Sequence, residues 1–103
     1  MKKFKISIIT VTKNSEKFIK ENIKSVLSQS FKNFEHIIVD GNSSDKTLKI
    51  AKSFKTKIRI IHNRNDKGLY HAMNVGIKHA KGDIIGILNS DDIYFKNTLK
   101  IVN

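Results

Sequence analysis

Apolar and polar positions follow two different periods along this chain. Short apolar runs, rich in β-branched residues, fill residues 5–12, 35–40 and 57–62, and a fourth run follows Gly82. Between these runs, apolar residues recur every three or four positions in segments that begin near residues 15, 46 and 69. The runs predict strands, and the spaced segments predict helices. We therefore expect four strands alternating with three helices, and a last helix beginning near Asn97.

This alternation predicts the class of fold. Each connection between successive strands can hold a helix, which favours parallel pairing. We predict an α/β fold with a doubly wound, mainly parallel and Rossmann-like sheet in βαβαβαβ order, formed by residues 1–103 as one domain. The strand at residues 5–12 is expected at the centre. Ligands of such sheets bind beyond the carboxyl ends of the strands, where the strand order reverses.

The fourth strand is expected to organise that edge. Its apolar run, residues 84–88, predicts burial on both faces, and the chain then reaches the adjacent carboxylates Asp91 and Asp92. A divalent cation such as Mg²⁺ or Mn²⁺, bridging to a diphosphate, would satisfy both carboxylates. The alternative is a simple helix-capping turn. Polar residues also follow the other strands, and those at 14–16 and 42–45 are expected to cap the next helices.

Composition removes several classes of function. The chain has no cysteine, which favours a reducing compartment such as the cytoplasm, and its apolar stretches are too short for a membrane span. We also expect no signal peptide. The net charge of +11 suggests nucleic-acid binding, but the lysines recur through the predicted helices as solvated faces, so we expect no nucleic-acid partner. A basic nucleic-acid-binding domain stays an alternative.

If this chain binds phosphate, it does so without the common glycine-rich phosphate-binding motifs. Neither a Gly-x-Gly-x-x-Gly after the first strand nor a Walker lysine motif occurs. Paired carboxylates with a metal are the natural substitute. Asp40, at the end of the second strand, is a candidate to accept hydrogen bonds from a base or ribose, and its alternative role is to cap the turn that follows.

Several sequence blocks, in this order and spacing, resemble family 2 glycosyltransferases of the GT-A fold. They are SIITVTKN (7–14), SVLSQSF (25–31), IVDGNSSD (38–45), DKGLYHAMNVG (66–76), GD (82–83) and NSDD (89–92). The resemblance implies a nucleotide-diphosphate-sugar site with UDP as the expected nucleotide, and Mg²⁺ or Mn²⁺ as cofactor. It also implies inverting transfer of the sugar to an acceptor hydroxyl, in polysaccharide or glycolipid synthesis of the cell envelope.

The same resemblance assigns roles to individual residues. Main chain near Val11 and Lys13 would lie against the base, and Asp40 would hydrogen-bond it. Asp91 would contact the ribose and Asp92 the metal, in a variant of the Asp-x-Asp motif. The implied nucleotide-sugar-binding residues are Thr10, Val11, Thr12, Lys13, Asn14, Glu16, Asp40, Asp66, Lys67, Gly68, Ser90 and Asp91, and the implied metal ligand is Asp92.

Members of the family typically run well beyond this length, and their later half carries the acceptor site and the general base. Residues 93–103 contain no Asp, Glu or His, so we expect a donor-binding part without the base or the acceptor half. A non-catalytic nucleotide-binding module and a truncated, inactive fragment are the alternatives. A saccharide or lipid-linked acceptor, self-association through an uncovered sheet edge, and peripheral association with the inner face of the membrane complete the expectations.

Overall fold

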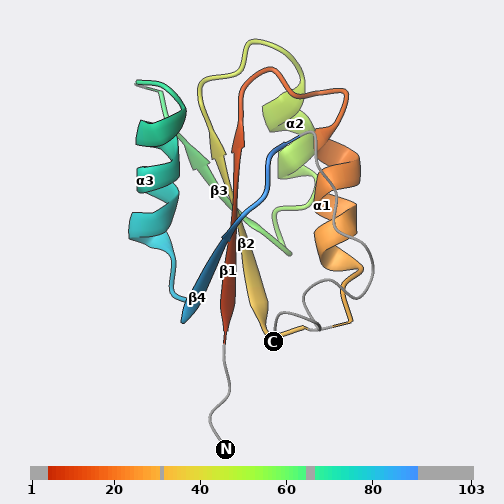
Figure 1. Ribbon diagram of the computed structural model, residues 1–103. Coiled ribbons are helices and arrows are strands. Elements are labelled where there is room, and N and C mark those ends of the chain that lie inside the picture. Colours follow the sequence, from red (N-terminus) through yellow and green to blue (C-terminus); the bar gives the residue numbers. More distant parts are fainter. Residues whose placement is uncertain (1–4, 31, 65–66, 91–103) are drawn as a thin grey trace, which may run out of the picture.

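The computed structural model describes residues 5–30, 32–64 and 67–90, and Figure 1 shows how their elements are arranged. The described strands and helices alternate as predicted. They are β1 (Ile6–Thr12), α1 (Ile19–Leu27), β2 (Phe34–Asp40), α2 (Thr47–Lys52), β3 (Arg59–His62), α3 (Leu69–His79) and β4 (Ile84–Ile87). The helix expected near Asn97 lies outside the described residues. In the described part of the chain, no helix is long and apolar enough to cross a bilayer.

The four strands form one parallel sheet in the order β3-β2-β1-β4. The chain moves outward from β1 through β2 to β3 and then returns to the other side of β1 for β4. Strand order therefore reverses between β1 and β4. Helices α1 and α2 lie on one face of the sheet, and α3 lies on the other (Figure 1). The doubly wound prediction and the central place of the first strand are confirmed.

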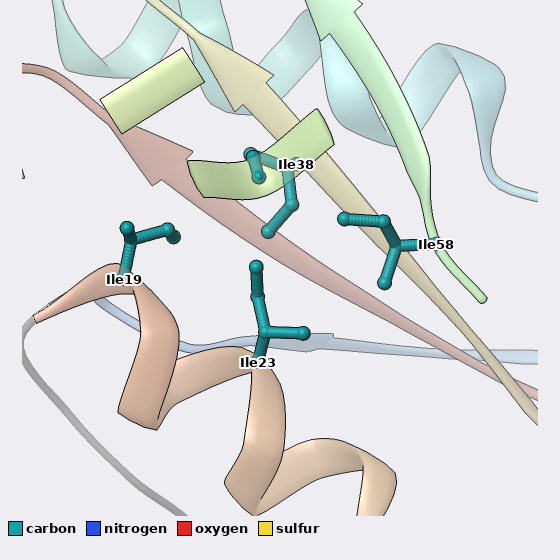
Figure 2. Close-up of a cluster of buried hydrophobic side chains, with 5 residues drawn as sticks. Ile19, Ile23, Ile38 and Ile58 are labelled. Atoms are coloured by element: carbon teal, nitrogen blue, oxygen red, sulfur yellow. The ribbon is translucent and has the colours of Figure 1, made fainter. Parts of the chain in front are cut away.

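Alternation along the strands divides the core into two layers. Ile38 of β2 points toward α1 and packs with Ile19, Ile23 and Ile58, as Figure 2 shows. Its neighbours on β2 point to the opposite face, where they pack with Ile9 of β1 and with α3. Both layers are fully enclosed around the two central strands, so the carboxyl ends of β1 and β2 rest on a rigid base.

Helix α3 lies unusually close to the sheet because of one glycine. A Cβ at Gly76 would stand 2.5 Å from Ile9 Cγ2 and 3.2 Å from Val39 Cγ2. Real side-chain carbons do not approach so closely, so the position accepts only hydrogen without some movement. The close approach holds α3 against β1 and β2, and its first residue, Leu69, is thereby fixed at the carboxyl edge of the sheet.

The prediction that the fourth strand is buried on both faces is wrong. Ile84, Ile85 and Ile87 are 39%, 41% and 41% exposed, and in the run 84–88 only Leu88, just past the strand, is buried. The reason is topological: β4 pairs with β1 at an edge of the described sheet. An apolar run of this length can form either a central strand or an edge strand, and the sequence pattern does not determine the strand order.

A polar cluster at the amino end of the sheet fixes the connection from α3 to β4. The Glu35 carboxylate accepts hydrogen bonds from Ser7 Oγ at 2.6 Å and from the Lys81 amide at 2.7 Å, and it pairs with Arg59 at 3.3 Å. Burial acts to raise the pKa of Glu35, but the hydrogen bonds from Ser7, Lys81 and Arg59 outweigh it and hold the pKa below the usual value. This end of the sheet is structural, and it leaves the opposite edge for ligands.

Candidate functional site

The carboxyl edge of the sheet carries a pocket of about 320 Å³ beside the reversal of strand order. The loops after β1 and β2, the start of α3 and the segment after β4 all contribute to it. Its lining residues are Val11, Thr12, Lys13, Ser15, Gly41, Gly68, Leu69, Asn89 and Ser90. A pocket here agrees with the general rule for open α/β sheets, because the two crossovers leave this edge on opposite faces and open a crevice between them.

The loops after β1 and β2 are joined by hydrogen bonds in which each loop caps the other. The Asn14 amide donates to Ser43 Oγ at 2.9 Å, and Asn14 Oδ1 accepts from the Ser44 amide at 2.8 Å. The Glu16 amide donates to Asp45 Oδ2 at 3.2 Å. These bonds hold the two loops at a fixed distance beside the pocket, without any glycine-rich segment.

The prediction that residues 14–16 cap the next helix is wrong, because their polar groups bond to the facing loop instead. Helix α1 begins later, with Phe18 as its N-cap residue and no side-chain cap. Asn14 instead adopts a positive φ of 50°, which asparagine tolerates better than most residues, and its side chain reaches the facing loop. In the other loop Asp45 does serve the following helix, because its Oδ1 accepts from the Thr47 amide at 2.9 Å.

Asp40 ends β2 directly behind the pocket. Its carboxylate is fully buried and accepts three hydrogen bonds: from Thr12 Oγ1 at 2.8 Å, from Ser43 Oγ at 2.6 Å and from the Ser43 amide at 3.0 Å. Thr12 and Asp40 are direct partners in the strand register, so the first bond follows from the sheet itself. Here Asp40 supports the turn after β2, and contact with a base stays a prediction.

Lys13 crosses from one loop to the other. Its ammonium group donates to the Gly41 carbonyl at 2.7 Å, although the residue as a whole is exposed. The bond places a positive charge and an aliphatic stem along the wall of the pocket that β1 and β2 share. Such an arrangement suits an anionic ligand with a flat apolar part.

The segment after β4 is tied to the opposite wall. Ser90 Oγ lies 2.9 Å from Ser15 Oγ, and Asn22 Nδ2 of α1 donates to the Asn89 carbonyl at 2.9 Å. These bonds fix the chain at the position immediately before Asp91. Asp66, Asp91 and Asp92 themselves lie outside the described residues.

The start of α3 supplies the last wall. Gly68 precedes the helix with φ 99° and ψ 177°, a combination essentially confined to glycine, and nothing lies within 4 Å of a Cβ built there. The positive end of the α3 helix dipole lies at this start and favours negative charge, so this wall also suits an anion.

The structure gathers some of the predicted residues and sets others apart. Val11, Thr12, Lys13, Gly68 and Ser90 line the pocket. Asn14, Glu16 and Asp40 stand behind the lining and fix the loops. Exposed Lys67 precedes Gly68 but is not a lining residue.

Thr10 lies one layer deeper than the pocket. It is fully buried, and its Oγ1 lies 2.8 Å from His36 Nε2. Burial lowers the pKa of His36 to about 3, so the imidazole is neutral and serves the core. The alternation of side chains along β1 explains the position of Thr10, which a loop boundary drawn from sequence could not separate from the pocket.

Four lining residues were not among the implied binding residues, although three of them lie in segments expected at this edge: Ser15, Gly41, Leu69 and Asn89. Each lies next to a predicted site residue, within three positions after a strand or at the start of a helix. That position was the available signal. Which of two neighbouring residues faces a pocket depends on loop geometry, which periodicity does not determine.

Within residues 5–30, 32–64 and 67–90, no group of three His, Cys, Asp or Glu side chains could hold a metal ion. Asn89 and Ser90, which carry amide and hydroxyl oxygens, line the pocket, and Asp91 and Asp92 follow them in sequence. This donor set consists of oxygen atoms, as Mg²⁺ and Mn²⁺ require. The residues present therefore fit a hard divalent cation only with the Asp91-Asp92 pair included.

The fold and the pocket together define a Rossmann-like domain with a polar, anion-compatible site at its switch point. The family model described as Glycosyl transferase family 2 matches residues 7–102, and the chain belongs to this family. Among curated relatives, the Escherichia coli UDP-Glc:alpha-D-GlcNAc-diphosphoundecaprenol beta-1,3-glucosyltransferase WfgD is 36% identical over 102 residues, which cover 98% of this chain and 40% of WfgD. Glycosyltransferase GlyG of Streptococcus pneumoniae serotype 4 is 35% identical over 98 residues, covering 92% of this chain and 33% of GlyG.

A solved structure gives the same result for the fold. The crystal structure of S. aureus TarS 1-349 in complex with UDP matches with a TM-score of 0.89 and 35% identity, covering 95% of this chain and 30% of that one. The predicted α/β fold of GT-A type is thus confirmed. This chain spans about 30–40% of the length of these three relatives.

Proposed function

We propose that this chain is the donor-binding part of a glycosyltransferase that takes a sugar from a UDP-sugar. The observation that carries the proposal is the pocket at the switch point, where the Lys13 ammonium group and the amino end of the α3 dipole both favour negative charge. The UDP complex of TarS, similar over 95% of this chain, supports the nucleotide. The name of WfgD describes a diphosphoundecaprenol acceptor, which supports a role in polysaccharide or glycolipid synthesis.

Each wall of the pocket has a proposed part in binding the donor. The base lies against the main chain of residues 11–13, and Asp40 hydrogen-bonds it after exchanging one of its present partners. The diphosphate lies between the start of α3, at Gly68, and the segment that follows Ser90. Asp91 would contact the ribose, and Asp92 would hold Mg²⁺ or Mn²⁺.

The proposed reaction is direct displacement at the anomeric carbon with inversion. When bound, the cation stabilises the negative charge of the departing diphosphate. Residues of this chain bind and orient the donor, and the dipole of α3 favours the same negative charge at its amino end. The base that deprotonates the acceptor hydroxyl is not assigned to any residue of this chain.

The test is a calorimetric titration of UDP and uridine, with Mn²⁺ and with EDTA. Free diphosphate and the carboxylates at this edge repel one another unless a cation lies between them. We therefore expect UDP to bind the wild-type chain with Mn²⁺ and much more weakly in EDTA. The affinity for uridine should be the same in both. Asp92→Asn keeps the size and removes the charge, so it should abolish the effect of Mn²⁺ on UDP.

A matched control is available at the other end of β4. Asp83→Asn makes the same change in an exposed carboxylate, which there accepts a hydrogen bond from the Lys5 amide at 3.1 Å. Its UDP binding should equal that of the wild type. Equal UDP affinity of the wild-type chain in Mn²⁺ and EDTA would show that Asp92 holds no catalytic metal.

A non-catalytic nucleotide-binding module is the second candidate, because none of the described residues is assigned as the general base. Assays of UDP-sugar hydrolysis and of transfer to an acceptor separate the two candidates. General bases typically contribute about 10²–10⁴-fold to such reactions. We expect this chain by itself to transfer sugar far below ordinary enzyme rates, and donor hydrolysis above background would support the catalytic candidate.

We also propose that the protein works in the cytoplasm, at the inner face of the membrane. The absence of cysteine favours a reducing compartment. A lipid-linked acceptor, as in the printed name of WfgD, would be presented at the membrane surface.

A further inference from the structure

One segment of the chain concentrates positive charge. Residues 46–64, from the turn before α2 to the residues after β3, contain five Lys and two Arg but no Asp or Glu. Seven positive charges of a net +11 thus lie within 19 residues. The other 84 residues carry thirteen Lys and Arg and all nine Asp and Glu, a net charge of +4.

Four of these lysines form a stripe along α2 and its continuation. Lys46, Lys49, Lys52 and Lys55 are all exposed and recur at every third position. Beyond the end of α2 the backbone continues in tighter turns, with the Phe54 amide bonded to the Ala51 carbonyl and the Lys55 amide to the Lys52 carbonyl. Turns of this kind bring side chains three positions apart onto the same side.

The stripe borders an apolar groove of about 530 Å³ between α2 and β3. Leu48, Ile58 and Ile60 supply its apolar lining, and Lys52, Lys55 and His62 complete it. Lysine stems can lie along apolar surface while their charged ends stay in water. The groove therefore presents apolar carbon beneath a cationic border.

This charge is not neutralised within the described part of the chain. No carboxylate there pairs with any lysine of the stripe. Arg59 does form an ion pair, at 3.3 Å, with Glu35, but neighbouring Ile60 and not Arg59 lines the groove. Like charges held together repel, so an external anionic surface would relieve the repulsion.

The groove also lies beside the donor pocket. His62 Nε2 lies 3.2 Å from Asn42 Oδ1, and Asn42 directly follows Gly41, which lines the pocket. Any surface bound along the groove therefore reaches the edge of the sheet where the donor is proposed to bind.

We infer that the lysine stripe docks this protein on an anionic phospholipid membrane, with the headgroup phosphates on the lysines and the groove, whose apolar residues are buried or half-buried, facing the headgroup layer. Clustered lysines near an anionic membrane surface each contribute about 1 kcal/mol to such binding. A single-stranded nucleic acid would favour stacking aromatics, and no Phe, Tyr or Trp lines the groove. The inference rests on the proposed function in one respect: a lipid-linked acceptor would lie in that membrane.

The test compares two double variants of equal net charge. Lys52→Glu with Lys55→Glu reverses the groove, and Lys78→Glu with Lys81→Glu reverses two exposed lysines at the end of α3 and just beyond it. Co-sedimentation is measured with vesicles of phosphatidylcholine alone and of equimolar phosphatidylcholine and phosphatidylglycerol. We expect wild-type protein to bind the anionic vesicles only, and the groove variant to bind them at least about thirtyfold more weakly, since two attractive charges are lost and two repulsive ones are added. The control variant should lose much less.

Three results would overturn the inference: no binding of the wild type to anionic vesicles, equal losses in the two variants, or tighter binding to an RNA oligomer through the same lysines. UDP titration of all three proteins separates this inference from the proposed function. If a variant no longer binds the vesicles but binds UDP as the wild type does, the docking surface is distinct from the donor pocket. Vesicle binding without UDP binding in the wild type would instead remove the proposed function and leave the membrane surface standing.

Discussion

Replacing Asp40 by Asn tests whether this carboxylate serves the turn alone or also the base. In the structure Oδ1 accepts from two hydroxyl groups and Oδ2 from the Ser43 amide. The hydroxyls can rotate and accept from an asparagine Nδ2, while its oxygen still accepts from the amide. Each bond then loses its charge-assisted character, so we expect about 1–3 kcal/mol less stability and an intact fold.

Binding distinguishes the two roles. If Asp40 also hydrogen-bonds the base, Asp40→Asn should weaken uridine and UDP alike by about tenfold, with or without Mn²⁺. Ser43→Ala is the control for the turn, because it leaves the Asp40 charge in place but removes both one donor to Asp40 and the acceptor of the Asn14 amide. The control should cost about 1–2 kcal/mol in stability, and its loss of uridine affinity, caused by the loosened loop alone, should be smaller than that of Asp40→Asn.

Urea denaturation gives the stability of each variant, and calorimetry gives the two affinities. Equal losses of uridine affinity in Asp40→Asn and Ser43→Ala would mean that Asp40 acts only through the turn. Unchanged affinity in Asp40→Asn would refute the base contact outright.

Two further predictions concern the core. Gly76→Ala gains about 1 kcal/mol in helix propensity but places a Cβ 2.5 Å from Ile9 Cγ2, and such overpacking typically costs about 1–3 kcal/mol. Denaturation should therefore show a net loss of stability of up to about 2 kcal/mol. A net gain would contradict the close packing of α3. His36 has a folded pKa of about 3, below that of an unfolded histidine, so its neutral form contributes stability fully above about pH 6.5, and this contribution is lost as the pH falls toward 3. The wild type should therefore lose roughly 2 kcal/mol more than His36→Gln between pH 7 and pH 5, and parallel stability curves of the two proteins would exclude a buried neutral imidazole.

The fold could be read from the sequence because its periods are clear. Strand β1 is followed by helix α1, whose apolar residues lie on one side. Two of them, Ile19 and Ile23, are fully buried, as the apolar spacing predicted. The strand order could not be predicted from these periods. Ile84, Ile85 and Ile87 look like a buried strand in sequence, but their exposure depends on which elements lie beside β4, and that is a property of the whole sheet.

The site was predictable as a region and not as a set of contacts. Residues at the ends of β1, β2 and β4 meet because parallel strands share their carboxyl edge. The functions of single polar side chains depend on partners far away in sequence. Asn14 illustrates this: its local sequence resembles a helix cap, whereas its side chain bonds to Ser44, 30 residues away. Local propensity offers no sign of such a partner, so the tertiary interaction prevailed.

These cross-loop bonds explain how the pocket keeps its shape without the glycine-rich loop found in other nucleotide-binding sheets. A glycine-rich loop brings main-chain amides to a phosphate directly, at the expense of chain entropy. Here the loop after β1 is fixed by side chains of the loop after β2, through Ser43, Ser44 and Asp45. A ligand entering between them meets groups that are already ordered, so its binding need not supply the free energy of ordering the loops. The residues that give the pocket its shape are therefore largely different from those that line it.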